Sequence, residues 1–190
     1  FYIENDIDKE EYGAYLRKEG NISKEEFRLY HTNDLIKRIY KTIKEYNSNI
    51  LFSIAPDGNI NNNYLYHSAD VKTWLSSNEY IDIIMPQIYY GFNNEYSPFM
   101  KVLESWEKLV TNKNIQIVPV LAIYKSGLED TDAGSGLNEW INNSDIIMRQ
   151  VNVIHEHKLQ GYALFRYDFI YDNSKLTAEG VKEIANLQKN

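Results

Sequence analysis

The chain has 190 residues, of which 43% are hydrophobic and 25% are charged, and its net charge is −7 at pH 7. This length and hydrophobic content predict a single domain, residues 1–190, with a sizeable core, and the acidic balance excludes the basic surface of a nucleic-acid-binding protein. The chain has no cysteine, which excludes disulfides, thiolate catalysis and zinc–cysteine sites, and it has no apolar run of the roughly 18 residues that a transmembrane helix needs.

The first part of the chain is predicted to be helical. Residues 8–19 have the pattern of a short helix that ends at Gly20. A longer helix is expected from Ser23 to about Tyr46, because Ser23 and Glu26 have the spacing of a capping box. The chain begins with Phe1 rather than Met, and we expect that it is the later part of a longer protein.

Four apolar runs further along the chain are predicted strands, and each turns polar or aromatic at its carboxyl end. They cover residues 50–55, 83–85, 115–123 and 162–166. Helices are expected over residues 69–75, 97–110 and 145–158, with a last helix starting at Thr177. Residues 59–63 are predicted to form an Asn-rich loop, and residues 124–143 a long irregular one.

This alternation of strands and helices predicts a parallel sheet with right-handed crossovers. The expected fold class is α/β, of the (β/α)8 TIM-barrel type. Because a closed barrel of this type takes about 250 residues, the chain has strands for about half of one.

The residues at the strand ends are the candidate binding site. They would converge on the mouth of a barrel, and their amide, phenol and charged groups suit a polyhydroxylated ligand: Asp57, Gln87, Tyr89, Tyr90, Tyr124, Lys125, Arg166 and Tyr167. Two alternatives stay open at this point. Asp57 can be a turn former within Pro-Asp-Gly, and Arg166 can form a surface salt bridge.

The 16 tyrosines are also consistent with a sugar-binding cleft, because a phenol stacks and hydrogen-bonds at once. The alternative is that a genome of biased base composition favours Tyr, Asn, Ile and Lys.

Glycoside hydrolysis usually needs two carboxyl groups on either side of the scissile bond. Asp57 is one candidate, and the loop of residues 124–143 offers Glu129, Asp130, Asp132 and Glu139. We favour Glu139, because the neighbouring Trp140 is an apolar group of the kind that raises the pKa of a general acid. Asn138 and Trp140 are expected to bind substrate beside it. A solvated loop carboxylate is the alternative for Glu139.

No metal or cofactor is expected. His155 and His157 are two residues apart on a predicted helix and point to different faces, while His31 and His67 are isolated. No Gly-rich phosphate loop follows a strand, and no Ser-His-Asp spacing is recognisable.

Five segments, in order along the chain, resemble the family 10 glycosyl-hydrolase-like proteins, a bacterial group that was formerly a domain of unknown function. They are Phe-Ser-Ile-Ala-Pro-Asp-Gly at 52–58, Asp-Val-Lys-Thr-Trp-Leu at 70–75, Met-Pro-Gln-Ile-Tyr-Tyr-Gly at 85–91, Gly-Ser-Gly-Leu-Asn-Glu-Trp at 134–140 and Leu-Phe-Arg-Tyr at 164–167.

This resemblance implies a (β/α)8 barrel of which the chain supplies roughly the last four parallel strands and their helices. It also implies an extracellular or cell-surface location, because many members are secreted or are lipoproteins of the cell envelope. Phe1-Tyr2 resembles the start of an aromatic Phe-Tyr-Pro segment of the family, with Ile3 in place of Pro. The resemblance implies that the acidic pair preceding this segment is the one that the family uses in catalysis, and this pair would then lie before residue 1. The catalytic carboxylates would be shared between that missing strand and this chain, with Asp57 or Glu139 as the second carboxyl.

Half of a barrel leaves its first and last strands unpaired, and such edges are normally covered. We therefore expect either a homodimer or a missing amino-terminal half to cover them.

The favoured hypothesis is a glycoside hydrolase that acts on a polysaccharide or oligosaccharide through a carboxylate pair at the mouth of the barrel. The main alternative is a non-catalytic carbohydrate-binding or surface protein with the same scaffold. A purely structural interaction domain is a third alternative, and it leaves the strand-end tyrosines without a purpose.

Overall fold

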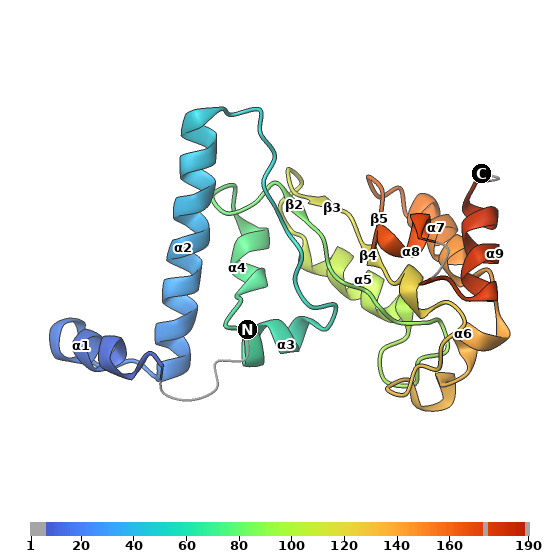
Figure 1. The fold of residues 1–190 in the computed structure, drawn as a ribbon. Helices are drawn as coiled ribbons and strands as arrows, with labels where there is room; N and C mark the ends of the chain where they lie inside the picture. Colours follow the sequence, from blue (N-terminus) through green and yellow to red (C-terminus); the bar gives the residue numbers. More distant parts are fainter. Residues whose placement is uncertain (1–6, 173–174, 189–190) are drawn as a thin grey trace.

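The computed structural model describes residues 7–172 and 175–188 (Figure 1). The expectation for Phe1-Tyr2 lies outside these residues. Two helices come first, α1 (Lys9–Glu19) and α2 (Lys24–Tyr46). The predicted capping box is confirmed, because the Ser23 hydroxyl accepts the backbone N–H of Glu26 and the Glu26 carboxylate accepts that of Ser23.

The strands are short and parallel, which confirms a mixed α/β fold. β1 (Ser53–Ile54), β2 (Ile83–Ile84) and β3 (Gln116–Ile117) form one sheet in that order. β4 (Val120–Leu121) and β5 (Ala163–Leu164) form a second pair. Within the described residues, β1 and β5 each have a strand neighbour on one side only.

The third predicted strand is divided into β3 and β4. The break falls at Pro119, which has no backbone N–H to donate. Before it, the Val118 N–H donates to the Ile84 carbonyl at 2.9 Å, and after it the Val120 N–H donates to the Pro86 carbonyl at 2.9 Å. Bridges from Asp57 to Gln87 and from Gln87 to Val120 link the two sheets, so four parallel segments lie side by side in chain order.

The remaining helices lie between and after the strands. They are α3 (Ile60–His67), α4 (Val71–Ser76), α5 (Phe99–Leu109), α6 (Glu139–Asn142), α7 (Ile146–Glu156), α8 (Asp168–Tyr171) and α9 (Ala178–Leu187). The 3₁₀ turns η1 (Ile123–Lys125) and η2 (Gly134–Gly136) interrupt the predicted irregular stretch, and the sequence analysis did not predict α6 or α8.

The prediction of a loop over residues 59–63 was wrong, because α3 begins there. Asn59 is its N-cap, and its side-chain oxygen accepts the backbone N–H groups of Asn61 and Asn62. Helix α5 starts at Phe99, two residues after the start of the predicted range 97–110. Pro98 is its N-cap, and the Ser97 N–H before it donates to Asn94 Oδ1 at 2.8 Å.

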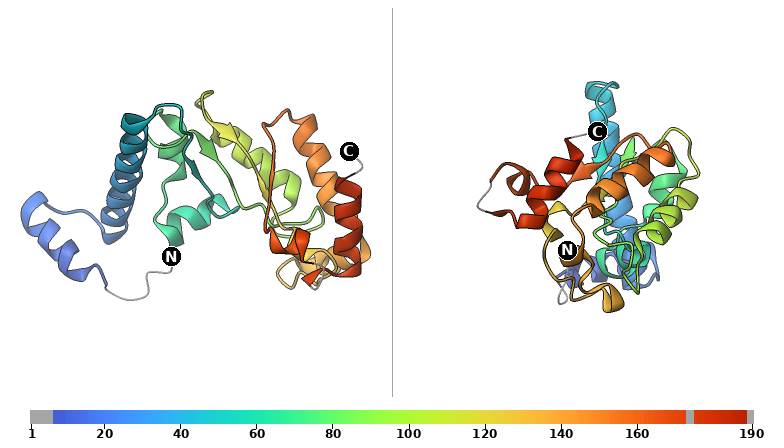
Figure 2. Two further views of the ribbon diagram at one scale, coloured as in Figure 1. Left: turned by 45° about the horizontal axis from the view of Figure 1, so that its top comes forward. Right: turned by 90° about the vertical axis from the view of Figure 1, so that its right-hand side faces the viewer.

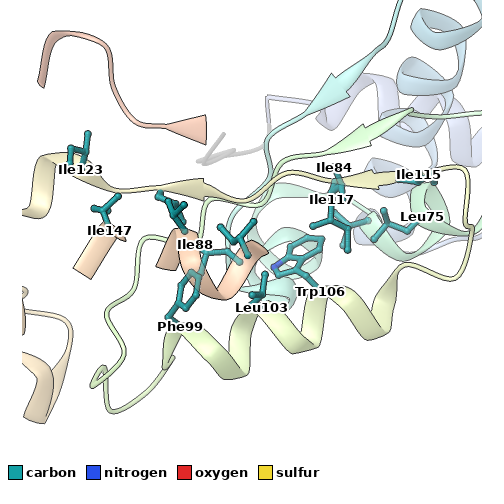
Figure 3. Packing of buried hydrophobic residues seen from close by; sticks show 14 of the residues in the cluster. Leu75, Ile84, Ile88, Phe99, Leu103, Trp106, Ile115, Ile117, Ile123 and Ile147 are labelled. Atoms are coloured by element: carbon teal, nitrogen blue, oxygen red, sulfur yellow. The ribbon is translucent and has the colours of Figure 1, made fainter. Parts of the chain in front are cut away.

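The core lies between the strands and helices α4, α5 and α7. Phe99, Leu103 and Trp106, at helical spacing on α5, are fully buried. Trp106 lies against Ile84 and Ile117 of the strands, and Phe99 lies near Ile88 (Figure 3). Burying side chains of this kind contributes roughly 1.5–3 kcal/mol each.

The two faces of the three-stranded sheet differ. Ile54, Ile84 and Ile117 share a row on the helix-covered face. The adjacent row, Ser53 and Gln116 on either side of Ile83, lies on the opposite face, and both outer residues of this row are exposed.

Helix α2 is tied to the strands through Asp82. One carboxylate oxygen of Asp82 accepts the Phe52 backbone N–H at 2.7 Å and lies 2.8 Å from Lys44 Nζ. The other accepts the Tyr40 hydroxyl at 3.2 Å.

The molecule is elongated, with α1 and α2 at one end and α7 and α9 at the other (Figure 2). Within the described residues, no helix is long and apolar enough to span a membrane.

Candidate active site at the carboxyl ends of the strands

A cavity of about 230 Å³ lies where β1, β2 and β4 end. It is lined by six of the predicted site residues, namely Asp57, Gln87, Tyr89, Tyr90, Tyr124 and Lys125, and by Gly58, Asn94, Asp130 and Asp132. A larger hollow of about 750 Å³ lies between α1 and α2, away from every strand end. The smaller cavity is the one that brings strand-end polar groups together.

Asp57 is held by the first turn of α3. Its Oδ1 accepts the Asn59 backbone N–H at 2.7 Å, and its Oδ2 accepts the Asn62 side-chain amide at 3.3 Å. His67 Nε2, at the end of the same helix, lies 3.7 Å from Oδ2. The Asn63 side chain clamps the Asp57 backbone by accepting its N–H and donating to its carbonyl. Helix α3, which lies where the sequence predicted a loop, therefore positions the Asp57 carboxylate.

Gly58 and Gln87 lie against each other at the floor of the cavity. A Cβ at Gly58 would overlap the backbone carbonyl oxygen of Gln87, so only glycine fits. The Gly58 carbonyl accepts the buried indole N–H of Trp106 at 2.8 Å, and the Gln87 side chain donates to the Ala55 carbonyl at 2.9 Å. These contacts connect the α5 core to the strand that ends in Asp57.

Besides Asp57 and the exposed Asp132, a third carboxylate, that of Asp130, lines the cavity. It is only 5% exposed, and its Oδ2 lies 2.8 Å from Lys125 Nζ. Burial, together with the charges of Asp57 and Asp130, raises the pKa of the Tyr90 phenol to about 12. Asp57, Tyr90 and Asp130 all line the same cavity.

The aromatic side of the cavity is formed by Tyr89 and Tyr124, whose rings meet edge to face with centroids 5.9 Å apart. Burial raises the pKa of both phenols, that of Tyr89 to about 12 with a further contribution from Tyr124. Phe165 packs on both rings, and its ring centroid lies 5.7 Å from that of Tyr89 and 6.1 Å from that of Tyr124.

Glu139 and Trp140 lie outside the cavity lining. Glu139 is 5% exposed, and its two carboxylate oxygens accept the backbone N–H groups of Phe92 at 3.0 Å and Asn93 at 2.8 Å. A Cβ at Gly91 would overlap this carboxylate. Trp140 is buried next to it. Glu139 therefore holds the loop after β2 in place. It is neither a solvated loop carboxylate nor part of the cavity lining, the two positions that the sequence suggested.

Three more predicted residues also lie away from the cavity. Arg166 donates two hydrogen bonds to Asp168, at 2.7 and 2.8 Å, in an exposed ion pair. This is the surface salt bridge that the sequence analysis left open. Tyr167 is exposed and stacks on Tyr171 at 4.5 Å, and Asn138 is exposed at the start of α6.

Two contributors to the site were not singled out from the sequence. Asn94 is buried and lines the cavity, while its Oδ1 accepts the Tyr96 and Ser97 backbone N–H groups. The only sequence signal for it is the Asn-Glu-Tyr-Ser-Pro turn. His67, isolated in the sequence, reaches Asp57 through the helix that was not predicted. Across residues 7–172 and 175–188, no group of three or more His, Asp or Glu side chains is placed to hold a metal ion.

The model of the family described as glycosyl hydrolase-like 10 matches residues 3–133, which include every residue of the cavity lining. The chain belongs to this family. The match confirms the resemblance seen in the sequence motifs, and it supports a hydrolase at the level of the family.

The chain is also similar to curated proteins. It is 23% identical over 189 residues to the glycosyl hydrolase DigH of Escherichia coli strain K12, and equally to the proteins of that name from Escherichia coli O157:H7 and Shigella flexneri. The alignments cover 90% of this chain and 42% of each relative. The chain thus spans less than half the length of these relatives.

Proposed function

We propose that this chain carries part of the active site of a glycoside hydrolase that cleaves a polysaccharide, with Asp57 and Asp130 as the carboxylate pair. The observation that carries the proposal is the cavity itself. It brings together three carboxylates from two strand-end loops, Asp57, Asp130 and the exposed Asp132, and a wall of tyrosines, in a family of glycosyl hydrolase-like proteins.

The two acids are held by different groups, as the two roles in glycoside hydrolysis require. Asp57 accepts hydrogen bonds from Asn59 and Asn62, while Asp130 is buried beside Lys125. In this mechanism one carboxyl group protonates the leaving oxygen, and the other attacks the sugar or activates water. Tyr90, between the two acids, keeps its proton at neutral pH and donates a hydrogen bond to the ligand or to a carboxylate.

We also propose that the parallel strands are half of a (β/α)8 barrel. Four parallel segments in chain order, one exposed sheet face and a length of 42% of the relatives support this arrangement. Further strands would pair with the open edges of β1 and β5 and cover the exposed face. The cavity would then lie at the mouth, where the active sites of such barrels occur.

The test is the release of reducing ends from bacterial cell-wall and host polysaccharides. Asp57→Asn and Asp130→Asn should each lower the rate at least about 100-fold, the size of a lost general acid or base. Asp34→Asn, an exposed acid on α2 in an i,i+4 ion pair, is the matched control and should leave the rate unchanged.

Circular dichroism would show that the variants are folded. Unchanged rates in both cavity variants would contradict the proposal. Glycan binding without release by the unsubstituted chain would favour the non-catalytic carbohydrate-binding alternative.

A further inference from the structure

Phe165 is an aromatic side chain beside the cavity for which the proposed carboxylate chemistry has no use. It directly follows β5, and 43% of its surface is exposed. An exposed large apolar side chain next to a polar cavity calls for a binding explanation more than a single apolar residue elsewhere on the surface does.

The strand register places Phe165 on the cavity side of the sheet. Ala163 pairs with Val120, Val120 bridges to Gln87, and Gln87 bridges to Asp57. Because side chains alternate along a strand, Phe165 points to the same face as Ala163 and therefore as Gln87 and Asp57. It thus extends the row of residues to which the proposed catalytic carboxylate belongs.

The ring of Phe165 packs against the two tyrosines of the cavity lining, Tyr89 and Tyr124. Tyr89 is tilted against it by 34° at 5.7 Å, and Tyr124 meets it edge-on, at 79° and 6.1 Å. Tyr124 is in turn packed on Phe169 at 6.0 Å. A ring held in this way loses little conformational freedom when a ligand covers its remaining face.

We propose that Phe165 is a stacking platform for a sugar ring of the substrate. This inference rests on the proposed carbohydrate substrate. A pyranose presents a face of C–H groups, which packs on an aromatic ring, while its hydroxyl groups point outward at the rim. Asp57, Gln87, Tyr89 and Lys125 supply hydrogen-bonding groups at that rim.

The experiment is calorimetric titration of the chain, carrying Asp57→Asn to prevent turnover, with three hexasaccharides of β-1,4-linked glucose, N-acetylglucosamine and galactose. We expect at least one of the three probes to bind. Phe165→Ala and Phe165→Leu should each weaken binding of that probe about tenfold, in the range of other stacked ligands. Phe165→Trp should retain binding.

Phe165→Leu is the informative variant, because it keeps an apolar side chain that supports the fold and removes only the flat ring. Tyr46→Ala, which removes an 85% exposed aromatic side chain at the far end of α2, should leave binding unchanged. Unaltered binding in Phe165→Leu, or no binding of any probe, would overturn the inference.

The same hexasaccharides separate this inference from the proposed function. Binding that depends on Phe165, without any release of reducing ends by the chain with Asp57 intact, would overturn the hydrolase and leave the platform standing. Hydrolysis with a KM that Phe165→Leu leaves unchanged would overturn the stacking platform and leave the proposed hydrolase standing.

Discussion

The carboxyl ends of the first three strand segments and the carboxyl end of β5 carry similar residues, yet they are used differently. At the first ends, Asp57 and Asp130 are oriented by α3 and Lys125 and line a cavity. At the end of β5, Arg166 is paired with Asp168 at the surface. Lys125 and Asp130 are also an ion pair, but theirs lies in the cavity lining, so a charged residue after a strand is a site candidate when its pair lines the cavity.

The loop of residues 124–143 shows the same contrast over a short distance. Asp130 faces the cavity, whereas Glu139, just as buried, accepts backbone N–H groups of another loop. Asp130 is the one that we propose for chemistry, whereas Glu139 holds the loop after β2 in place. The predictions below test this division between site and scaffold, starting from the largest expected effect.

Glu139→Ala should destabilise the protein by about 3 kcal/mol, because it removes a buried carboxylate that accepts two hydrogen bonds and leaves the N–H groups of Phe92 and Asn93 without this acceptor. Urea unfolding followed by circular dichroism measures this loss. Glu139→Gln, which keeps one oxygen acceptor, should lose less. If Glu139→Ala abolished hydrolysis at unchanged stability, the carboxylate would belong to the site after all.

Trp106→Phe should lower the free energy of unfolding by about 1–2 kcal/mol, since it removes the 2.8 Å hydrogen bond to the buried Gly58 carbonyl and keeps most of the apolar volume. Thermal unfolding is the measurement. Because Gly58 adjoins Asp57, we also expect weaker hydrolysis by the folded variant. A stability equal to that of the unsubstituted protein would show that the indole N–H does not anchor this loop.

Glu183→Gln should change the dependence of stability on pH. The Glu183 carboxyl of α9 is buried at the start of α7, where it accepts the Ile147 N–H at 3.2 Å, and burial raises its pKa above 4.5. The folded state therefore holds this proton more tightly than the unfolded state. Its contribution to stability is full below pH 4.5 and falls as the pH rises through the folded pKa.

The difference in unfolding free energy between Glu183→Gln and the unsubstituted protein should accordingly grow with rising pH in favour of Gln. Urea titrations at several pH values above and below 4.5 measure this difference. A difference that is constant with pH would contradict the assignment.

Arg166→Ala should have the smallest effect. The pKa of Asp168 is lowered to about 2 by Lys175 and by Arg166, so the variant should raise this pKa towards 3.8 in a carboxyl NMR titration. Hydrolysis and stability should change little, because exposed ion pairs contribute little. A large loss of hydrolysis would show that Arg166 belongs to the site, and the end of β5 would then not differ from the other strand ends.

Local signals in the sequence predicted much of the fold. The capping box at Ser23, the apolar runs of the strands and the helix beginning at Thr177 each depend on residues close together in the chain. The failures were also local. The Asn-rich segment was taken for a loop although Asn59 is a good N-cap, and the break at Pro119 was overlooked.

The site was harder to predict, because the partners that decide a residue's role are distant in the sequence. Glu139 is used by N–H groups 46 and 47 residues away, which no spacing rule reveals. In contrast, Asp57, Gln87 and Tyr89 were found because parallel strands place their carboxyl ends at one edge. Sequence alone thus indicates where a site lies better than which of its acids act.

The most direct test of the account is a crystal structure of the chain bearing Asp57→Asn with a β-1,4-linked glucose or N-acetylglucosamine hexasaccharide bound. The account predicts one sugar ring on Phe165 and the glycosidic oxygen between residue 57 and Asp130, with the two side chains roughly 5 to 10 Å apart. A sugar chain bound elsewhere, or one that leaves Asp130 covered by Lys125 and out of contact, would contradict it.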